Sequence, residues 1–530
     1  MYEIIKLISL ICALFTLNSL FADNYMELIW EQEGEFIDAE YGYSLASIDF
    51  NGDNIDDLVV GSPRWNSSGI PGGTNQGKIY FYFGGTVFDT IPDLTIDGAQ
   101  HNFPSRLGGH IVNLHDINGD GYEDLGSIWK DDWQSDIKYF VDIYFGGPDS
   151  DTIPDFTHII YREGVENITS FYPLGDVNGD GFYDAGYVLR SLAPTFDNSF
   201  YILYGAEIPT IEYWAGFGSI IGTIREIGNI NNDLFDDFII GFYDNTSSLY
   251  SNIIIYGNTI IEPMIIDTLY NNSNSFYPGG AYAGDYNGNG TDDFIGCWGG
   301  AGGTGIWYGC NELNIEPDVI LSAYTSQAKG YDWGDLNNDG FSDIVLGNPF
   351  WSNDQGKTYF FIGDENANGS IDLEIPCSAV VGTKFGTSVV VGDFNDDGFD
   401  DAAIGAPEEG WPIDEGKVYV YAGNDSLEET TPVSVNEIIS IPEITFNAYP
   451  NPFNPTVNFE IKAEGYDNLQ IVIYNIKGQK VEILAIAEGD NAHCRIFWNA
   501  ENQPSGVYLC KLVNIETKAQ LAVQKITLLK

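Results

Sequence analysis

Positive charge is scarce in this chain. Its 530 residues hold 21 lysines and arginines against 78 aspartates and glutamates, which gives a formal net charge of −57. We expect no nucleic-acid partner, because contacts with phosphates require Lys and Arg. We expect instead that many of the acids bind metal ions, which would relieve their mutual repulsion.

Cysteine and histidine are also rare, and they form no catalytic pattern. Six cysteines are too few for a disulfide framework in a chain of this length. The five histidines are scattered, and no Gly-x-Ser-x-Gly elbow or phosphate loop stands out. We therefore predict no catalytic residues, no organic cofactor and no enzyme. Abundant carboxylate pairs keep open one alternative, a polysaccharide-degrading lyase or glycoside hydrolase.

The N-terminal segment resembles a secretory signal. Lys6 precedes an apolar run at 8–17, and Ala22 is a suitable cleavage residue. This predicts a signal peptide over residues 1–22, since the run is shorter than a membrane-spanning helix requires. We expect a secreted protein with no transmembrane span after cleavage; an anchoring helix is the alternative.

A nine-residue acidic loop occurs seven times, beginning at Asp49, Asp116, Asp176, Asn229, Asp285, Asp335 and Asp393. Side chains that carry oxygen occupy loop positions 1, 3, 5 and 9 of every copy. Ca²⁺ takes six to eight such ligands, so we predict about five to six structural ions. The predicted ligands are Asp49, Asn51, Asp53, Asp57, Asp116, Asn118, Asp120, Asp124, Asp176, Asn178, Asp180, Asp184, Asp285, Asn287, Asn289, Asp293, Asp335, Asn337, Asp339, Asp343, Asp393, Asn395, Asp397 and Asp401.

The acidic loop has two other possible interpretations, an EF-hand and a turn without metal. An EF-hand requires a Glu at position 12 and flanking helices, and neither is present. A metal-free Asn/Asp-Gly turn stays open, above all for copy four, where Asn229 and Leu234 replace the first Asp and the Gly.

The residues around each loop predict four short antiparallel strands per repeat, which is one propeller blade. No fourth strand follows Gly423, whereas an extra segment, 26–30, precedes the first loop. We predict that this segment closes the ring as the outer strand of the last blade. The expected fold is all-β: a seven-bladed β-propeller at 23–423, a linker at 424–440, and a small Ig-like β-sandwich at 441–530.

The repeat resembles the FG-GAP (VCBS-type) repeat of integrin α-subunits. The upstream signature occurs as Tyr41-Gly-Tyr-Ser44 and Phe385-Gly-Thr-Ser388, and the downstream Gly-x-Pro occurs at Gly61, Gly347 and Gly405. These two sequence signatures are clear in blades one, six and seven and poorly matched in the other blades. The resemblance implies a propeller over 26–423 with calcium ligands at loop positions 1, 3, 5 and 9 and the carbonyl of position 7.

An aromatic residue follows the second strand of each blade, on the face opposite the acidic loops. We predict a surface that binds a glycan or a protein, because Trp and Tyr are frequent in interaction hot spots. Packing between blades is the alternative. The candidates are Trp65, Trp129, Trp298, Trp351 and Trp411.

The C-terminal domain at 441–530 begins with Tyr449-Pro-Asn-Pro-Phe-Asn-Pro455 and continues with alternating strands. It resembles the type A sorting domain of type IX secretion. That implies contact with the secretion machinery and placement outside a Gram-negative-type envelope; a generic Ig-like module is the alternative. Cys494 and Cys510 flank a predicted hairpin turn, and a disulfide between them stays open.

We expect a calcium-binding adhesion module at the cell surface. The sequence leaves open the ligand, the oligomeric state, and whether the C-terminal domain is cleaved or retained.

Overall fold

The computed structural model describes residues 25–428 and 445–530, with gaps at 69–73, 102–104, 132–137, 149, 162–164, 192–197, 218–219, 245–248, 260–266, 272–279, 299–302, 311–312, 315, 323–327, 378–381, 409–414, 463–468, 476, 478–479, 487–493 and 515–519. The predicted signal peptide and Trp411 lie outside the described residues. The chain divides into two compact units, Met1–Thr431 and Pro432–Lys530. No described helix is long and apolar enough to cross a membrane.

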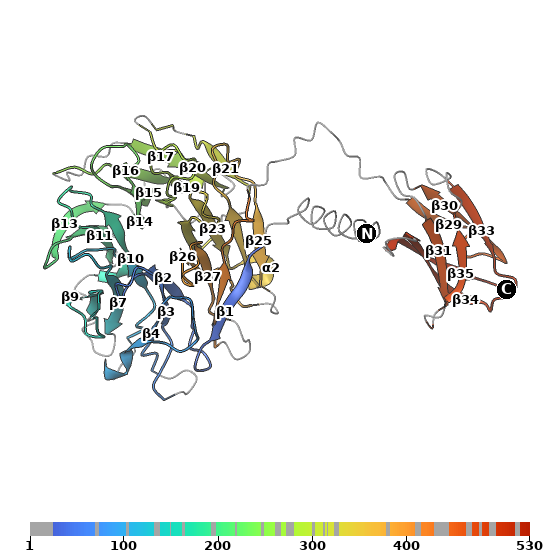
Figure 1. Ribbon diagram of the computed structural model, residues 1–530, viewed down its shortest axis with the longest axis horizontal. Helices are drawn as coiled ribbons and strands as arrows, with labels where there is room; N and C mark the ends of the chain where they lie inside the picture. Colours follow the sequence, from blue (N-terminus) through green and yellow to red (C-terminus); the bar gives the residue numbers. More distant parts are fainter. Residues whose placement is uncertain are drawn as a thin grey trace, which may run out of the picture. The chain divides into compact units, whose positions relative to one another are not determined.

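Seven four-stranded antiparallel sheets make up the described part of the first unit, and Figure 1 shows them arranged around a common centre, as in a β-propeller. The first strands of the sheets are β2 (Ser44–Ile48), β6 (Ile111–Asn113), β10 (Val165–Gly175), β14 (Ile220–Gly228), β18 (Gly280–Tyr282), β22 (Gly330–Gly334) and β26 (Ser388–Gly392). The second strands are β3 (Asp57–Ser62), β7 (Leu125–Asp131), β11 (Asp184–Ser191), β15 (Asp237–Asp244), β19 (Phe294–Trp298), β23 (Asp343–Asn348) and β27 (Asp401–Ala406).

The third and fourth strands complete each sheet. The third strands are β4 (Lys78–Tyr82), β8 (Lys138–Tyr144), β12 (Asn198–Tyr204), β16 (Leu249–Ile255), β20 (Gly303–Trp307), β24 (Lys357–Phe361) and β28 (Lys417–Ala422). The fourth strands are β5 (Leu94–Asp97), β9 (Phe156–Tyr161), β13 (Thr210–Phe217), β17 (Asp267–Asn271), β21 (Val319–Leu321), β25 (Leu373–Pro376) and β1 (Glu27–Glu33). The described residues of this unit also include two short helical turns, η1 (Gly98–His101) and α2 (Trp351–Asp354).

The N-terminal strand closes the ring. Strand β1 pairs antiparallel with β28, with Glu27 opposite Ala422 and Glu33 opposite Lys417. The predicted pairing of the 26–30 segment with the last blade is therefore confirmed. The first and last sheets also meet directly, because the Ser388 hydroxyl donates to the Gly42 carbonyl at 2.7 Å.

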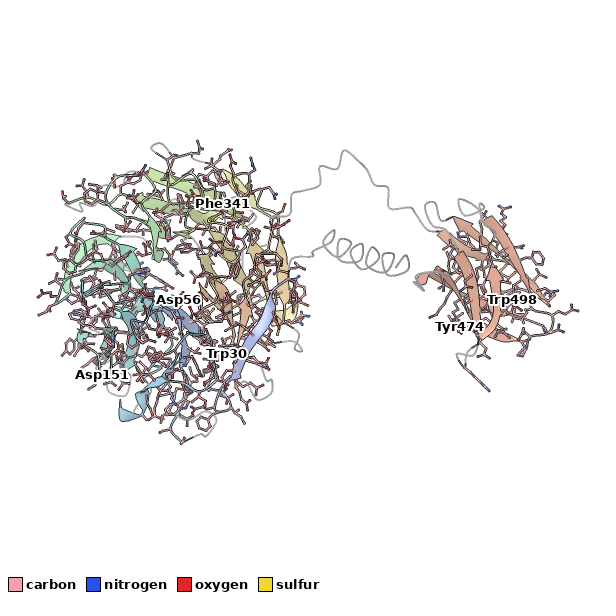
Figure 2. The ribbon with its side chains drawn as sticks, viewed as in Figure 1. Trp30, Asp56, Asp151, Phe341, Tyr474 and Trp498 are labelled. Carbon is pink, nitrogen blue, oxygen red and sulfur yellow. The ribbon has the colours of Figure 1, made fainter. Side chains whose placement is uncertain are left out.

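The second unit has two sheets around one apolar core. One sheet contains β29 (Thr445–Tyr449), β30 (Thr456–Lys462) and β33 (Cys494–Asn499), and the other contains β32 (Lys480–Ala485), β31 (Leu469–Asn475), β34 (Gly506–Asn514) and β35 (Gln520–Leu528). Both contribute to the core, for example through Phe459 and Trp498 of the first sheet and Ile473 and Leu512 of the second. Trp498 and Tyr474 are labelled in Figure 2.

The predicted hairpin between Cys494 and Cys510 was wrong. Strand β33 pairs with β30, and β34 pairs with β31 and β35, so the two cysteines belong to different sheets. Cys510 is a buried free thiol. The sequence pattern was symmetrical about the turn, but the chain passes from one sheet to the other there.

Candidate metal-binding loops

The seven acidic loops connect the first and second strands of each sheet and wrap around the side chain at position 1. In the first loop the Asp49 carboxylate accepts the backbone N–H groups of Gly52, Asp53 and Asn54 at 2.9, 3.0 and 2.8 Å. Asp116 receives the same three bonds from its own loop. A carboxylate has about four lone-pair directions, so these bonds leave capacity for a cation.

Position 5 tightens the same turn, because its side chain accepts the backbone N–H of position 7. Asp53 accepts from Ile55 at 3.0 Å, and Asp397 accepts from Phe399 at 3.0 Å. Position 6 needs a positive φ, which Asn54 adopts at 66° and Gly121 at 93°. The local sequence thus folds each loop into a compact hairpin with its polar side chains on one side.

Position 9 is the buried anchor of every loop. Its carboxyl group is fully buried in all seven copies, at Asp57, Asp124, Asp184, Asp237, Asp293, Asp343 and Asp401. Burial, with the charges of Asp53 and Asp49 nearby, raises the pKa of Asp57 to about 8. A buried carboxyl beside other acids is the environment in which a bound cation stabilises the ionised form most.

A glycine at the end of the third strand supports this carboxyl group. Gly84 N–H donates to Asp57 at 2.9 Å, and Gly363 N–H donates to Asp343 at 2.7 Å. A Cβ on Gly84 would lie 2.2 Å from the Asp56 carbonyl, so no larger residue fits. The sequence showed the recurrent glycine but gave no sign of this role.

The seventh loop leaves two predicted ligand atoms without a partner. Asn395 Oδ1 and Asp401 Oδ2 are buried and have no hydrogen-bond partner. Buried polar atoms of this kind call for a compensating group. The donor set at positions 1, 3, 5 and 9 is three carboxylates and one amide, all oxygen ligands of the type that suits Ca²⁺.

Copy four differs in chemistry. The Asn229 side-chain amide donates to the Asp233 carbonyl at 3.1 Å, so it closes the loop with a proton donor of its own. Leu234 at position 6 is 86% exposed. The fourth loop therefore has a neutral residue where the other copies present a carboxylate.

Within the described part of the chain, no three His, Cys, Asp or Glu side chains are grouped closely enough to form a metal site as they stand. The predicted ligands of each loop share one hairpin, but the calcium sites stay a prediction.

Acids at loop position 8 join neighbouring blades, a role that sequence reasoning missed. Asp56 accepts the N–H of Asp393 at 2.9 Å, and Asp400 accepts the N–H of Asp335 at 2.7 Å. Glu123 accepts the N–H of Asp49 in the same way. Figure 2 shows Asp56 on the inner side of the ring. The recurrence of an acid beside position 9 was the available signal.

Two of the five candidate tryptophans pack inside the protein. Trp65 and Trp129 are buried, at 6% and 7% exposure. The Trp129 ring stacks on Phe140 at 3.8 Å between centroids, and the Lys78 ammonium lies 5.1 Å from the Trp65 ring. These two tryptophans are therefore packing residues, as the alternative interpretation held.

Trp351 is half-buried, and the Lys357 ammonium lies 4.2 Å from its ring centre. Lys357 is in turn paired with Glu374 at 2.8 Å. Because the Lys357 ammonium lies over the Trp351 ring, less of the ring surface is accessible to a sugar. The Trp298 side chain and all of Trp411 lie outside the described residues.

Comparison with known proteins identifies both parts of the chain. A family model described as FG-GAP repeat matches residues 41–82, 332–361 and 385–421, and one described as Secretion system C-terminal sorting domain matches residues 447–528. The three FG-GAP matches fall in the blades whose signatures are clearest in the sequence. The chain thus carries integrin α-like FG-GAP repeats and a C-terminal sorting domain, which marks a secreted or cell-surface protein.

Integrin alpha-5 of Xenopus laevis is 26% identical over 165 residues, which is 29% of this chain and 15% of the integrin. Integrin alpha-4 of Xenopus laevis is 36% identical over 95 residues, 17% of this chain and 9% of the integrin. Phosphatidylinositol-glycan-specific phospholipase D of Mus musculus is 36% identical over 101 residues, 17% of this chain and 12% of that protein. The matches therefore span a small part of each relative.

A solved structure titled "Crystal structure of BBS1N in complex with ARL6DN, soaked with lead" aligns with a TM-score of 0.42 and 11% identity, covering 77% of this chain and 98% of that chain.

Proposed function

We propose that this protein is an exported binding module, in which a closed seven-bladed propeller holds structural Ca²⁺ in its inner loops. The seven four-stranded sheets and the pairing of β1 with β28 support the blade count. The C-terminal unit, with two sheets packed around a shared core, is an Ig-like sandwich that directs export. The ligand is an extracellular glycan or protein.

One observation carries the calcium assignment: the seventh loop buries Asn395 Oδ1 and Asp401 Oδ2 without hydrogen-bond partners. A hard cation bound by positions 1, 3, 5 and 9 would satisfy both atoms. When bound, Ca²⁺ would neutralise the carboxylates that crowd each hairpin. All seven loops have oxygen-bearing side chains at positions 1, 3, 5 and 9. We propose that loop four stays metal-free because the Asn229 side-chain amide donates a hydrogen bond within the loop and replaces a carboxylate.

Binding fits this chain better than catalysis. The ligand sets are local to each hairpin, and the predicted ions serve the scaffold. The integrin-like repeats favour recognition over catalysis, and the phospholipase match covers too little of that enzyme to transfer its activity. A polysaccharide-degrading enzyme on the same propeller remains the competing proposal.

A matched pair of substitutions in the seventh loop tests the calcium sites. Asp397 is a proposed ligand, whereas Asp396 is an exposed neighbour at position 4 of the same loop. Both changes to Asn remove one charge and keep the shape of the side chain. Calorimetric titration of Ca²⁺ into the full chain should show one weakened site in Asp397→Asn and none in Asp396→Asn. No calcium uptake by the wild type would refute the assignment.

A glycan array and a polysaccharide-cleavage assay, each run with and without Ca²⁺, separate the two functions. Calcium-dependent retention of a glycan without cleavage supports the binding module. Release of reducing or unsaturated ends from a polysaccharide would establish the enzyme and overturn the proposal.

A further inference from the structure

The second unit concentrates the positive charge that the rest of the chain lacks. Residues 441–530 contain eight lysines and arginines against nine aspartates and glutamates. The distribution is uneven over the surface of this unit, and three of the lysines lie on one sheet: Lys480 on β32, Lys511 on β34 and Lys525 on β35.

Strand register places these lysines on the outer face of the four-stranded sheet. One cross-strand row reads Lys480, Tyr474, Leu509, Lys525, and the neighbouring row reads Ile483, Val472, Lys511, Val523. Ile471, Ile473, Cys510 and Leu512 alternate with these positions and point into the core. Side chains of successive strand residues point to opposite faces, so the described side chains of both rows face away from the core.

We call these two rows the basic outer face. Neither row contains Asp or Glu, and the exposed Glu482 of β32 lies between them in sequence, opposite Ile473. The basic outer face also exposes apolar surface between the lysines, since Ile483 is 43% and Leu509 40% exposed. Lysine and exposed aliphatic side chains in alternation form a surface that is both charged and apolar. Such a surface suits a protein partner with an acidic rim around an apolar patch.

Several lysines of the first unit are paired with acids within the protein. Lys78, Lys357 and Lys384 each form an ion pair with a glutamate at 2.9, 2.8 and 2.5 Å. In contrast, Lys480 and Lys525 are exposed, and the described residues give neither of them nor Lys511 a carboxylate partner. The Lys511 ammonium lies 5.8 Å from the centre of the Tyr474 ring.

We infer that the basic outer face is the surface by which the sorting domain contacts the secretion machinery, through an acidic and partly apolar protein surface. The inference rests on the sorting-domain match at 447–528. The other sheet is less suited, because its Arg495 is already paired with Glu460 at 2.7 Å. Opposite charge steers the encounter, and the apolar residues between the lysines hold the complex.

Charge reversal of the three lysines in the full chain, Lys480→Glu with Lys511→Glu and Lys525→Glu, tests this surface in the producing bacterium. The matched control reverses three basic residues of the same unit that lie off the rows, Lys477→Glu, Arg495→Glu and Lys530→Glu. We expect export, measured as the surface and medium fraction against the periplasmic fraction, to fall about tenfold in the first variant only.

Two further controls separate the possible outcomes. Thermal melting of the purified variants establishes that they fold; if the triple reversal unfolds, Lys511→Gln with Lys525→Gln replaces it. Deletion of 441–530 must abolish export, and normal export of that deletion would refute the sorting function itself.

Blocked export by the deletion but normal export by the triple reversal would overturn the inference about this face. Equal loss in the off-row control would overturn it too, because net charge alone would then explain the effect. Normal export with loss of binding to phosphatidylglycerol vesicles would assign the face to an anionic lipid surface instead.

Discussion

At the scale of single residues, neighbouring loops fit together through positions 4 and 7. The Tyr122 ring of the second loop covers Gly52 of the first, and a Cβ there would lie 2.3 Å from it. In loop four position 4 is Asn232, and position 7 of loop five is the smaller Thr291, whereas Asn338 of loop six is followed by Phe399 at position 7 of loop seven. Both types at position 4 adopt positive φ, at 79° for Gly52 and 57° for Asn232.

We predict that Gly52→Asn destabilises the protein by about 2 kcal/mol, because the new side chain meets the Tyr122 ring although Asn tolerates the backbone conformation. The double variant Gly52→Asn with Tyr122→Thr copies the pair in loops four and five, and should recover most of the loss. Urea unfolding of the four proteins of this cycle measures the coupling. Additive effects would contradict the proposed contact.

Glu226 on β14 is a second residue with a measurable consequence. Burial raises its pKa to about 7, Asp236 and Asp292 add to the rise, and His115 opposes it. The folded protein therefore holds a proton that the unfolded chain loses near its ordinary pKa of 4.5. The stability contributed by the protonated group is complete below pH 4.5 and is lost as the pH rises through 7.

Glu226→Gln removes this dependence, because Gln stays neutral. At pH 8 we expect the variant to be more stable than the wild type by roughly 3 kcal/mol, and at pH 4 we expect almost no difference. Thermal melts at both pH values in constant Ca²⁺ make the comparison. A wild type that is the more stable protein at pH 8 would show that the ionised carboxylate is the favoured form.

At the scale of elements, Trp30 anchors β1 to the first blade. This side chain is 4% exposed, its ring meets Tyr82 at 5.2 Å, and its Nε1–H donates to the Asp89 carbonyl at 2.8 Å. It therefore joins the N-terminal strand to the first blade as well as to its own sheet. Leu28 on the same strand is 41% exposed.

Trp30→Ala should lower the free energy of unfolding by about 3–5 kcal/mol, the usual cost of removing a buried Trp side chain. Leu28→Ala, at a position of the same strand that is 41% exposed, should cost less, about 1 kcal/mol or below. Denaturant unfolding followed by tryptophan fluorescence and circular dichroism gives both values. A comparable loss in the two variants would place the anchor elsewhere along β1.

Element order was largely predictable from the sequence, because the loops repeat in phase. The strand that closes the ring could be inferred from spacing alone, since an orphan segment at one end matched a missing strand at the other. The burial of Trp65 and Trp129 could not be inferred from the sequence, because a Trp that follows a strand is compatible with both a binding surface and a packed interface. The predicted hairpin between Cys494 and Cys510 was wrong for a related reason, because a symmetrical turn sequence does not reveal that the chain changes sheet.

At the scale of the whole molecule, the position 9 carboxyls and the acids at position 8 place many like charges near the inner ends of the blades. Mutual repulsion destabilises such a ring unless cations lie between the acids. The candidate ligands were predictable from residue type and spacing. The contacts of Asp56 and Asp400 with the next blade depend on the closed ring, so no single repeat could reveal them.

Removal of calcium should therefore lower the melting temperature of the whole propeller. Each filled site adds about 2.7 kcal/mol at a hundredfold excess over its dissociation constant, so we expect a fall of at least about 5 °C in EGTA. Restoring Ca²⁺ should reverse it, and Mg²⁺ at the same concentration should not, because Mg²⁺ sheds its water reluctantly. Identical melts with and without EGTA would exclude a structural role for the ions.

The pairing of Glu27 with Ala422 also constrains biosynthesis. Because the chain is synthesised from its N-terminus, β1 has no partner strand until β28 has been made. Contacts between residues so distant in sequence close slowly and at a high entropic cost. Until the two strands pair, each of them has an unpaired edge. We therefore expect the newly made protein to bind chaperones and to be sensitive to proteases.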